Sequence, residues 1–112
     1  MWQLGRLALL ACTGCGSALS NAVDEYEAGR TTHALRQLQS PAARDACSDA
    51  HDHARYALFR GLAHLTLGDA HAAERWLLGL KRQLERQPDL LSTADKSRLV
   101  SALGSMGHLP GD

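Results

Sequence analysis

The amino-acid sequence predicts a small all-α domain, and three observations support this prediction. The chain has 112 residues, enough for one domain. Leu, Ala, Arg, Gln and Glu are plentiful, whereas β-branched residues are few and there are only three prolines, which is a helix-forming composition. Apolar residues recur at spacings of three and four, as on one face of a helix. These runs are followed by Gly29, Gly68 and Gly107, which are evenly spaced along the chain. The number of residues from Gly29 to Gly68 is the same as that from Gly68 to Gly107, and we call this separation along the sequence the glycine interval.

The first fifteen residues, MWQLGRLALLACTGC, carry a single charge ahead of a short apolar run. A basic end, an apolar middle and small residues before a cleavage site are typical of a secretory signal. The run is too short to cross a bilayer, which takes roughly 20 apolar residues. We therefore interpret residues 1–15 as a signal segment and residues 16–112 as the helical domain. The alternative is a buried N-terminal helix in a cytoplasmic protein.

The segment Leu9-Leu10-Ala11-Cys12 resembles the lipobox of bacterial lipoproteins, in which a leucine and a small residue precede the cysteine. In that family the cysteine becomes the new N-terminus and carries acyl chains. The resemblance implies lipidation at Cys12, with Cys15 as the alternative, and a membrane-anchored location in the bacterial cell envelope. After export, Cys47 could form a disulfide with whichever of these two cysteines is not acylated. In a reducing cytoplasm it would be a small buried residue.

The helical domain is expected to contain two units and a final helix. Residues 17–39 form the first and more degenerate unit, and residues 40–51, SPAARDACSDAH, are predicted to be a loop. The second unit, 52–87, is the clearest, and residues 92–107 form a capping helix. The expected apolar stripes of the three parts contain Ala22, Ala34 and Leu38; Ala54, Ala57, Leu58, Gly61, Leu62, Leu65, Ala73, Trp76, Leu77, Leu80 and Leu84; and Leu99, Ala102, Leu103 and Met106.

Local signals define the helix ends of the second unit. Gly68 can adopt the left-handed conformation that a helix stop needs, Asp69 can cap the following helix, and Pro88 ends that helix. Gly61 lies in the middle of a helix, where glycine costs up to about 1 kcal/mol relative to alanine, so we expect another backbone to pass close to it. Ser92-Thr93-Ala94-Asp95 is a capping-box pattern at the start of the last helix.

Residues 54–87 resemble one tetratricopeptide repeat (TPR), a helix–turn–helix unit of about 34 residues. The resemblance is in the small residues of the two helices and in the turn between them, with Gly29 and Ala34 in register in the first unit. Ala57 and His64 depart from it, because the family often has tryptophan and tyrosine there. The resemblance implies repeat packing through Gly29, Ala34, Gly61, Gly68 and Ala73.

In TPR-like arrays the first helices line a concave groove that binds extended peptides or partner helices. The resemblance therefore implies a partner-binding groove at Arg55, Leu58, Leu62, Leu65 and Thr66. Several of these are apolar, so the alternative is that they pack against the first unit. Stacked repeats usually need three or more units. We therefore expect self-association, or docking of a protein or peptide partner through an exposed helix face.

Composition and motifs argue against other functions. Twelve basic residues balance twelve acidic ones, so we expect no nucleic-acid partner. No nucleophile motif, phosphate-binding loop or H-E-x-x-H motif is present, so we expect neither an enzyme nor a cofactor. A small metal-binding protein that uses Cys47, His51 and His53 is a second alternative, since cysteine and histidine are zinc ligands. The leading hypothesis is a non-catalytic TPR-like adaptor or assembly factor of the envelope, and the first alternative is a cytoplasmic one.

Overall fold

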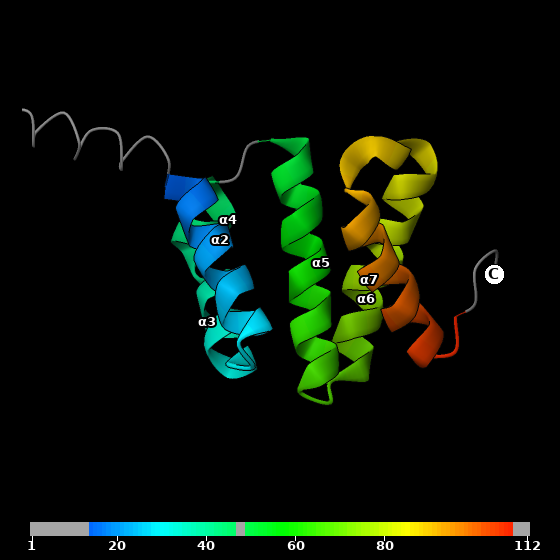
Figure 1. Cartoon of the computed structure of the whole chain (residues 1–112), viewed down its shortest axis with the longest axis horizontal. Helices are drawn as coiled ribbons and strands as arrows, with labels where there is room; N and C mark the ends of the chain where they lie inside the picture. The colour runs from blue at the N-terminus through cyan, green and yellow to red at the C-terminus, as the bar shows by residue number, and fades with distance from the viewer. Residues whose placement is uncertain (1–13, 47–48, 109–112) are drawn as a thin grey trace, which may run out of the picture.

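The computed structural model describes residues 14–46 and 49–108, and every regular element in this part of the chain is a helix (Figure 1). The prediction of an all-α fold is confirmed. The elements are α2 (Gly14–Glu27), α3 (Thr31–Gln39), α4 (Pro41–Ala46), α5 (Ala50–Thr66), α6 (Ala70–Arg86), the 3-10 helix η1 (Pro88–Leu90) and α7 (Thr93–Ser105).

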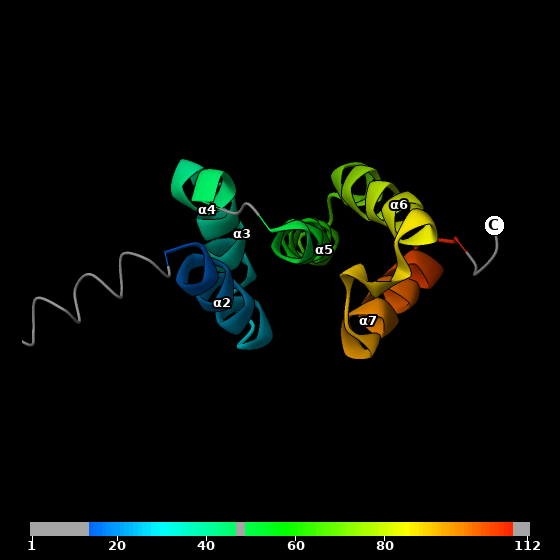
Figure 2. The same cartoon turned by 90° about the horizontal axis from the view of Figure 1, so that it is seen from above.

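Two antiparallel helix pairs, α2/α3 and α5/α6, stand side by side, and α7 packs on the second pair (Figure 1). The long helix α5 is central, because it contacts α2 and α3 on one side and α6 and α7 on the other. Viewed from above, α2 and α7 project from one side of α5, whereas α4 and α6 lie toward the other (Figure 2). The three helices α2, α5 and α7 therefore lie along an arc in this view.

The three evenly spaced glycines form the same helix stop. Gly29, Gly68 and Gly107 have φ angles of 86°, 89° and 91°, in the left-handed region that disfavours side chains. In each case the glycine N–H donates to the carbonyl three residues before it. The N–H of the next residue donates to the carbonyl five residues before that residue, as in a Schellman motif. The spacing in the sequence is therefore a repeat of backbone geometry.

Helix α5 is buried around most of its circumference. The predicted stripe holds Leu58 and Leu62, but Tyr56, Phe59 and Ala63 are buried as well. A helix at the edge of a domain buries one stripe, whereas α5 is covered from both sides. Its buried tyrosine finds a partner within the core, since the Tyr56 hydroxyl donates to the carbonyl oxygen of Leu38 at 2.6 Å.

The close approach expected at Gly61 involves a side chain. A Cβ atom added to Gly61 would lie 2.5 Å from Leu77 Cδ2 and 2.6 Å from Leu77 Cγ, with Trp76 Cβ at 3.3 Å. These nearest atoms are side-chain atoms of α6, and the expectation of a neighbouring backbone stays a prediction. The absent side chain of Gly61 makes the space that the fully buried Leu77 occupies.

The predicted loop 40–51 is largely helical, which corrects the sequence prediction. Residues Pro41–Ala46 form α4, and α5 begins at Ala50. The Ser40 hydroxyl accepts from the Ala43 N–H at 3.3 Å, and proline is favourable in the first turn of a helix. Ala43 is buried and α4 packs on α2. So short a helix gives no apolar periodicity, which is why we expected a loop.

Candidate partner-binding groove

A groove of about 460 Å³ is lined by residues of α2, α5 and α7, the three helices that lie along an arc in Figure 2. Its floor is apolar, with Leu62 and Ala102 each 6% exposed and Leu65 half-buried. The remaining lining residues are polar or aromatic, namely Tyr26, Ser97, Arg98 and Ser101. Three helices that are distant in sequence therefore form one open surface with an apolar base and a rim of hydroxyl groups.

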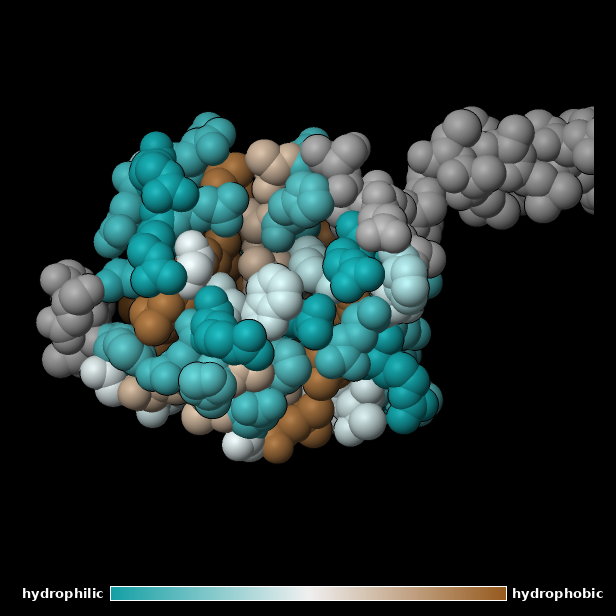
Figure 3. Space-filling view, turned by 180° about the vertical axis from the view of Figure 1, so that it is seen from behind, coloured by the Kyte–Doolittle hydropathy of each residue, from teal (hydrophilic) through white to brown (hydrophobic). Residues whose placement is uncertain are grey.

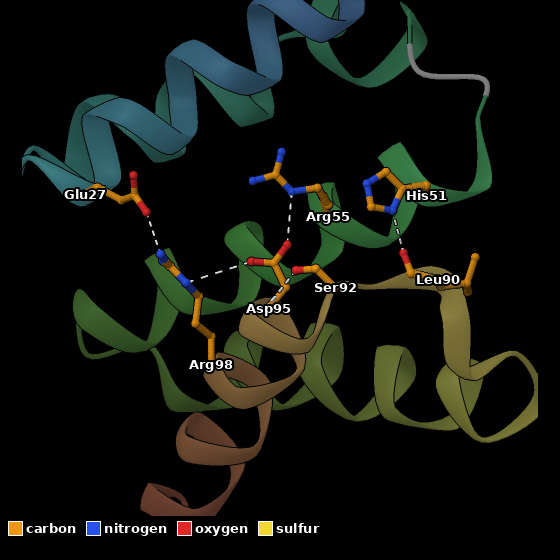
Figure 4. A network of polar contacts seen from close by, with 7 residues as sticks. All are labelled: Glu27, His51, Arg55, Leu90, Ser92, Asp95 and Arg98. Carbon is orange, nitrogen blue, oxygen red and sulfur yellow. Dashed lines mark hydrogen bonds and ion pairs between the residues drawn. The ribbon is translucent and has the colours of Figure 1, made fainter.

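An ion-pair network joins the same three helices (Figure 4). The Asp95 carboxylate of α7 accepts from Arg55 Nε of α5 at 3.2 Å and lies 3.9 Å from Arg98 Nε. Arg98 in turn donates to the Glu27 carboxylate of α2. Both guanidinium groups lie 5.4 Å from the ring centroid of the buried Phe59, within the range of cation–π contacts. Two cations and two carboxylates thus neutralise each other beside the groove.

Asp95 has a second role at the start of α7. Its backbone N–H donates to the Ser92 hydroxyl at 3.2 Å, which is the first half of the capping box that the sequence predicts. Its carboxylate faces Arg55 on α5 (Figure 4). The Asp95 side chain is only 11% exposed, and a carboxylate that loses hydration is stabilised by a charged partner. Asp95 is therefore both the residue whose N–H the Ser92 side chain caps and the link between α7 and α5.

The five residues predicted to line a groove separate into different environments. Leu62 and Leu65 line the groove, and Thr66 lies at its edge, where its hydroxyl is 3.3 Å from the Tyr26 hydroxyl. Leu58 is fully buried in the core, and Arg55 belongs to the ion-pair network. The alternative of packing against other helices therefore describes Leu58.

Sequence reasoning missed Tyr26, Ser97, Arg98 and Ser101, although the glycine interval could have indicated three of them. Tyr26 lies one glycine interval before Leu65, and Ser101 lies one glycine interval after Leu62. Ser97 lies one glycine interval after Leu58. The interval extends the predicted groove from α5 to α2 and α7 only when it is applied to groove residues as well as to glycines and packing residues.

The predicted packing residues include buried alanines within the second helices and glycines in the turns before them. Ala34 of α3 and Ala73 of α6 are both fully buried, and they are separated by one glycine interval. Gly29 and Gly68 end the first helix of each pair. A Cβ atom added to Gly29 or Gly68 would meet nothing within 4 Å, so these two glycines act through their backbone conformation, whereas the alanines take up little space in the core.

Of the predicted lipidation and metal residues, those whose side chains the structure describes do not line this groove. Cys12 and Cys47 lie outside the described residues, and Cys15 falls in the first turn of α2. His51 Nδ1 lies 2.7 Å from the Leu90 carbonyl oxygen, which joins α5 to η1 (Figure 4), and His53 is exposed. Within residues 14–46 and 49–108, no three His, Cys, Asp or Glu side chains are grouped to hold a metal ion. Among the helices of these two ranges, none combines the length and the hydrophobicity that crossing a bilayer requires.

The opposite face of the molecule differs from the groove. From behind, the surface is mostly hydrophilic, with smaller apolar areas between the helices (Figure 3).

The chain matches no known family model, no curated protein and no solved structure. The function must therefore be argued from the groove and its chemistry.

Proposed function

We propose that this protein is a non-catalytic, TPR-like interaction module that holds a peptide or a partner helix in the groove between α2, α5 and α7. One observation carries the proposal. The groove is lined by the first helix of each pair and by α7, and the first helices line the binding groove in the TPR family that the sequence resembles. The position of α5, with α2 and α3 on one side and α6 and α7 on the other, is consistent with this proposal.

The groove favours an uncharged partner segment with apolar anchors. Leu62, Leu65 and Ala102 offer an apolar floor, and the Ser97 and Ser101 hydroxyls can bond to the backbone of a bound peptide. The positive charge of Arg98 is already matched by Glu27. A strongly acidic or basic segment would gain little, whereas one or two apolar side chains would bury surface against the floor.

Peptide selection on the full chain tests the groove. A random peptide library is screened against the wild type, and the affinity of the selected peptides is then measured for two variants. Ser101→Trp fills the groove, and Gln83→Trp places the same side chain at an exposed position of α6. We expect Ser101→Trp to weaken binding by at least about tenfold, roughly 1.4 kcal/mol, and Gln83→Trp to leave it unchanged. Equal binding to both variants would contradict the proposal.

We further propose that the module acts as an adaptor or assembly factor held at the bacterial envelope through Cys12. The support is the lipobox-like segment before Cys12, since several acyl chains hold a protein at a membrane almost permanently. Bacteria that express the full chain are fed labelled palmitate, with Cys12→Ala and Cys15→Ala as variants. Label that is lost only in Cys12→Ala is the expected result. An unlabelled wild type contradicts the anchor and favours a cytoplasmic adaptor, without bearing on the groove.

A further inference from the structure

A second, smaller groove of about 210 Å³ lies on the other flank of α7, between α6 and α7. It is lined by apolar side chains that include Leu84, Leu99 and Leu103, with lysines and a glutamate at its edge. Val100 in this groove is 49% exposed. A large aliphatic side chain left this open beside other apolar residues indicates a contact surface.

The glycine interval shows what lies on the equivalent flank of α5. Val100 follows Gly61 by one glycine interval, and Gly61 is the residue of α5 against which Leu77 of α6 packs. In α5 this flank is covered by a helix antiparallel to it (Figure 1). In α7 the same flank carries Val100 and forms the wall of an open groove. The surface is therefore shaped for an antiparallel helix.

The residues along α7 make a second α7 a suitable occupant. Gly104 lies one turn after Val100, and a Cβ atom added to Gly104 would meet nothing within 4 Å. When two α7 helices lie antiparallel, centred near Ala102, Val100 of each faces Gly104 of the other. The large residue then fills the space that the small one leaves, as Leu77 does at Gly61.

The charges at the two ends of the groove agree with this arrangement. Lys96 lies in the first turn of α7, at the edge of the groove. At the other end of α7, the Glu74 carboxylate of α6 lies 2.7 Å from His108 Nε2. Antiparallel packing brings Lys96 of one copy toward Glu74 of the other, twice by symmetry. Opposite charges therefore meet at both ends of the contact.

We propose that two copies of this chain associate through a two-fold, antiparallel α7–α7 contact that buries Val100 of each copy against Gly104 of the other. The contact lies on the flank of α7 opposite the peptide groove. A dimer formed in this way leaves both peptide grooves open. Such a dimer would be a bivalent module. The proposal of dimerisation does not depend on the function proposed for the groove.

Sedimentation of the full chain tests the contact. The chain carries Cys12→Ala and Cys15→Ala and is kept reduced, so that neither acylation nor a disulfide contributes to association. Gly104→Leu has open space in the monomer and replaces glycine by a better helix former, so the monomer stays folded. We expect the dimer dissociation constant to rise by at least about tenfold. Gly79→Leu is the matched control, because Gly79 also has open space but belongs to α6 and lies outside the proposed α7–α7 contact.

A charge exchange tests the register of the two helices. Lys96→Glu and Glu74→Lys are each expected to weaken the dimer, and the double variant is expected to restore it. Three results would overturn the proposal: a wild type that stays monomeric at its highest soluble concentration, a Gly104→Leu variant that dimerises as tightly as Gly79→Leu, or a double variant that is no tighter than either single variant.

Discussion

The first and second helix pairs have the same glycine stop but differ in how their two helices pack. In the second pair, Leu77 fills the space left by Gly61. One glycine interval earlier, the first pair has Ala22 and Leu38, and both are fully buried. The first pair thus has a small and a large buried residue at the same two positions, with a methyl group where the second pair has none. Its second helix, α3, has 9 residues, whereas α6 has 17.

The two pairs also begin their second helices differently. The Asp69 carboxylate caps α6 by accepting from the Ala72 N–H at 3.2 Å. The residue at the same position in the first pair is Arg30, which makes no side-chain cap. Instead, Arg30 donates to the Glu25 carboxylate at 2.7 and 3.0 Å, and this bond lowers the pKa of Glu25. The repeated feature is therefore where the chain reverses, while capping and packing are specific to each pair.

The contact at Gly61 should give the largest effect. Gly61→Val introduces into α5 the residue that α7 has one glycine interval later. Its Cβ atom would overlap with the buried Leu77, so we expect urea denaturation to show a loss of about 3 kcal/mol. Gly79→Val, at an open position of α6, is the control. A Gly61→Val variant that is no less stable than this control would mean that the pair can separate at little cost.

The next effect compares a buried ion pair with an exposed one. Asp95→Ala leaves Arg55 and Arg98 without the carboxylate between them, and we expect it to lower the free energy of unfolding by about 2 kcal/mol. Glu27→Ala removes the exposed partner of Arg98, and here we expect at most about 0.5 kcal/mol. Urea denaturation of both variants measures the two losses in the free energy of unfolding. Equal losses would mean that the network is not anchored at Asp95.

The cap of α6 should contribute less. Asp69→Ala removes the acceptor for the Ala72 N–H, so we expect a loss of about 1 kcal/mol on urea denaturation. Asp69→Asn keeps a side-chain oxygen in place and should retain most of the stability. If the alanine and asparagine variants are equally destabilised, the Asp69 charge matters rather than its hydrogen bond.

The smallest effect concerns pH. Burial, together with the positive charges of Arg60 and Arg75, lowers the pKa of His64, against an opposite effect of Asp69. The unfolded chain therefore takes up a proton near the ordinary pKa of about 6.5, while the folded protein takes it up only at lower pH. The contribution of neutral His64 to the free energy of unfolding is complete above that ordinary pKa. It is lost as the pH falls through the lower pKa that His64 has in the folded protein. His64→Gln should reduce the loss of stability on acidification, measured by urea denaturation across this range. His71→Gln, at an exposed site, is the control and should leave the loss unchanged.

Much of the fold could be predicted because it depends on short segments. The stops at Gly29, Gly68 and Gly107 and the caps at Asp69 and Ser92 each involve residues within about two turns of a helix. The apolar stripes of α6 and α7 could be recognised because each of these helices covers one side of the core. For α5 the pattern was incomplete, since it is covered from two sides, and α4 was too short to show a period.

The groove could be predicted only in part. Its residues in α5 followed from the TPR resemblance, but Tyr26 and Ser101 come from helices on either side of α5 and carry no local signal for a shared surface. The lipobox-like segment, the cysteine pairing and the metal alternative stay predictions, since Cys12 and Cys47 lie outside the described residues.

The local sequence was sufficient for helix type, helix ends and chain reversal, because backbone hydrogen bonds, caps and left-handed glycines act between near neighbours. Contacts across the fold were needed for the surfaces on either side of α7. Arg55 of α5 pairs with Asp95 of α7, and Glu27 of α2 pairs with Arg98 of α7. Their charges meet only when α2, α5 and α7 are packed together, and Val100 is left exposed only because no described helix covers that flank of α7.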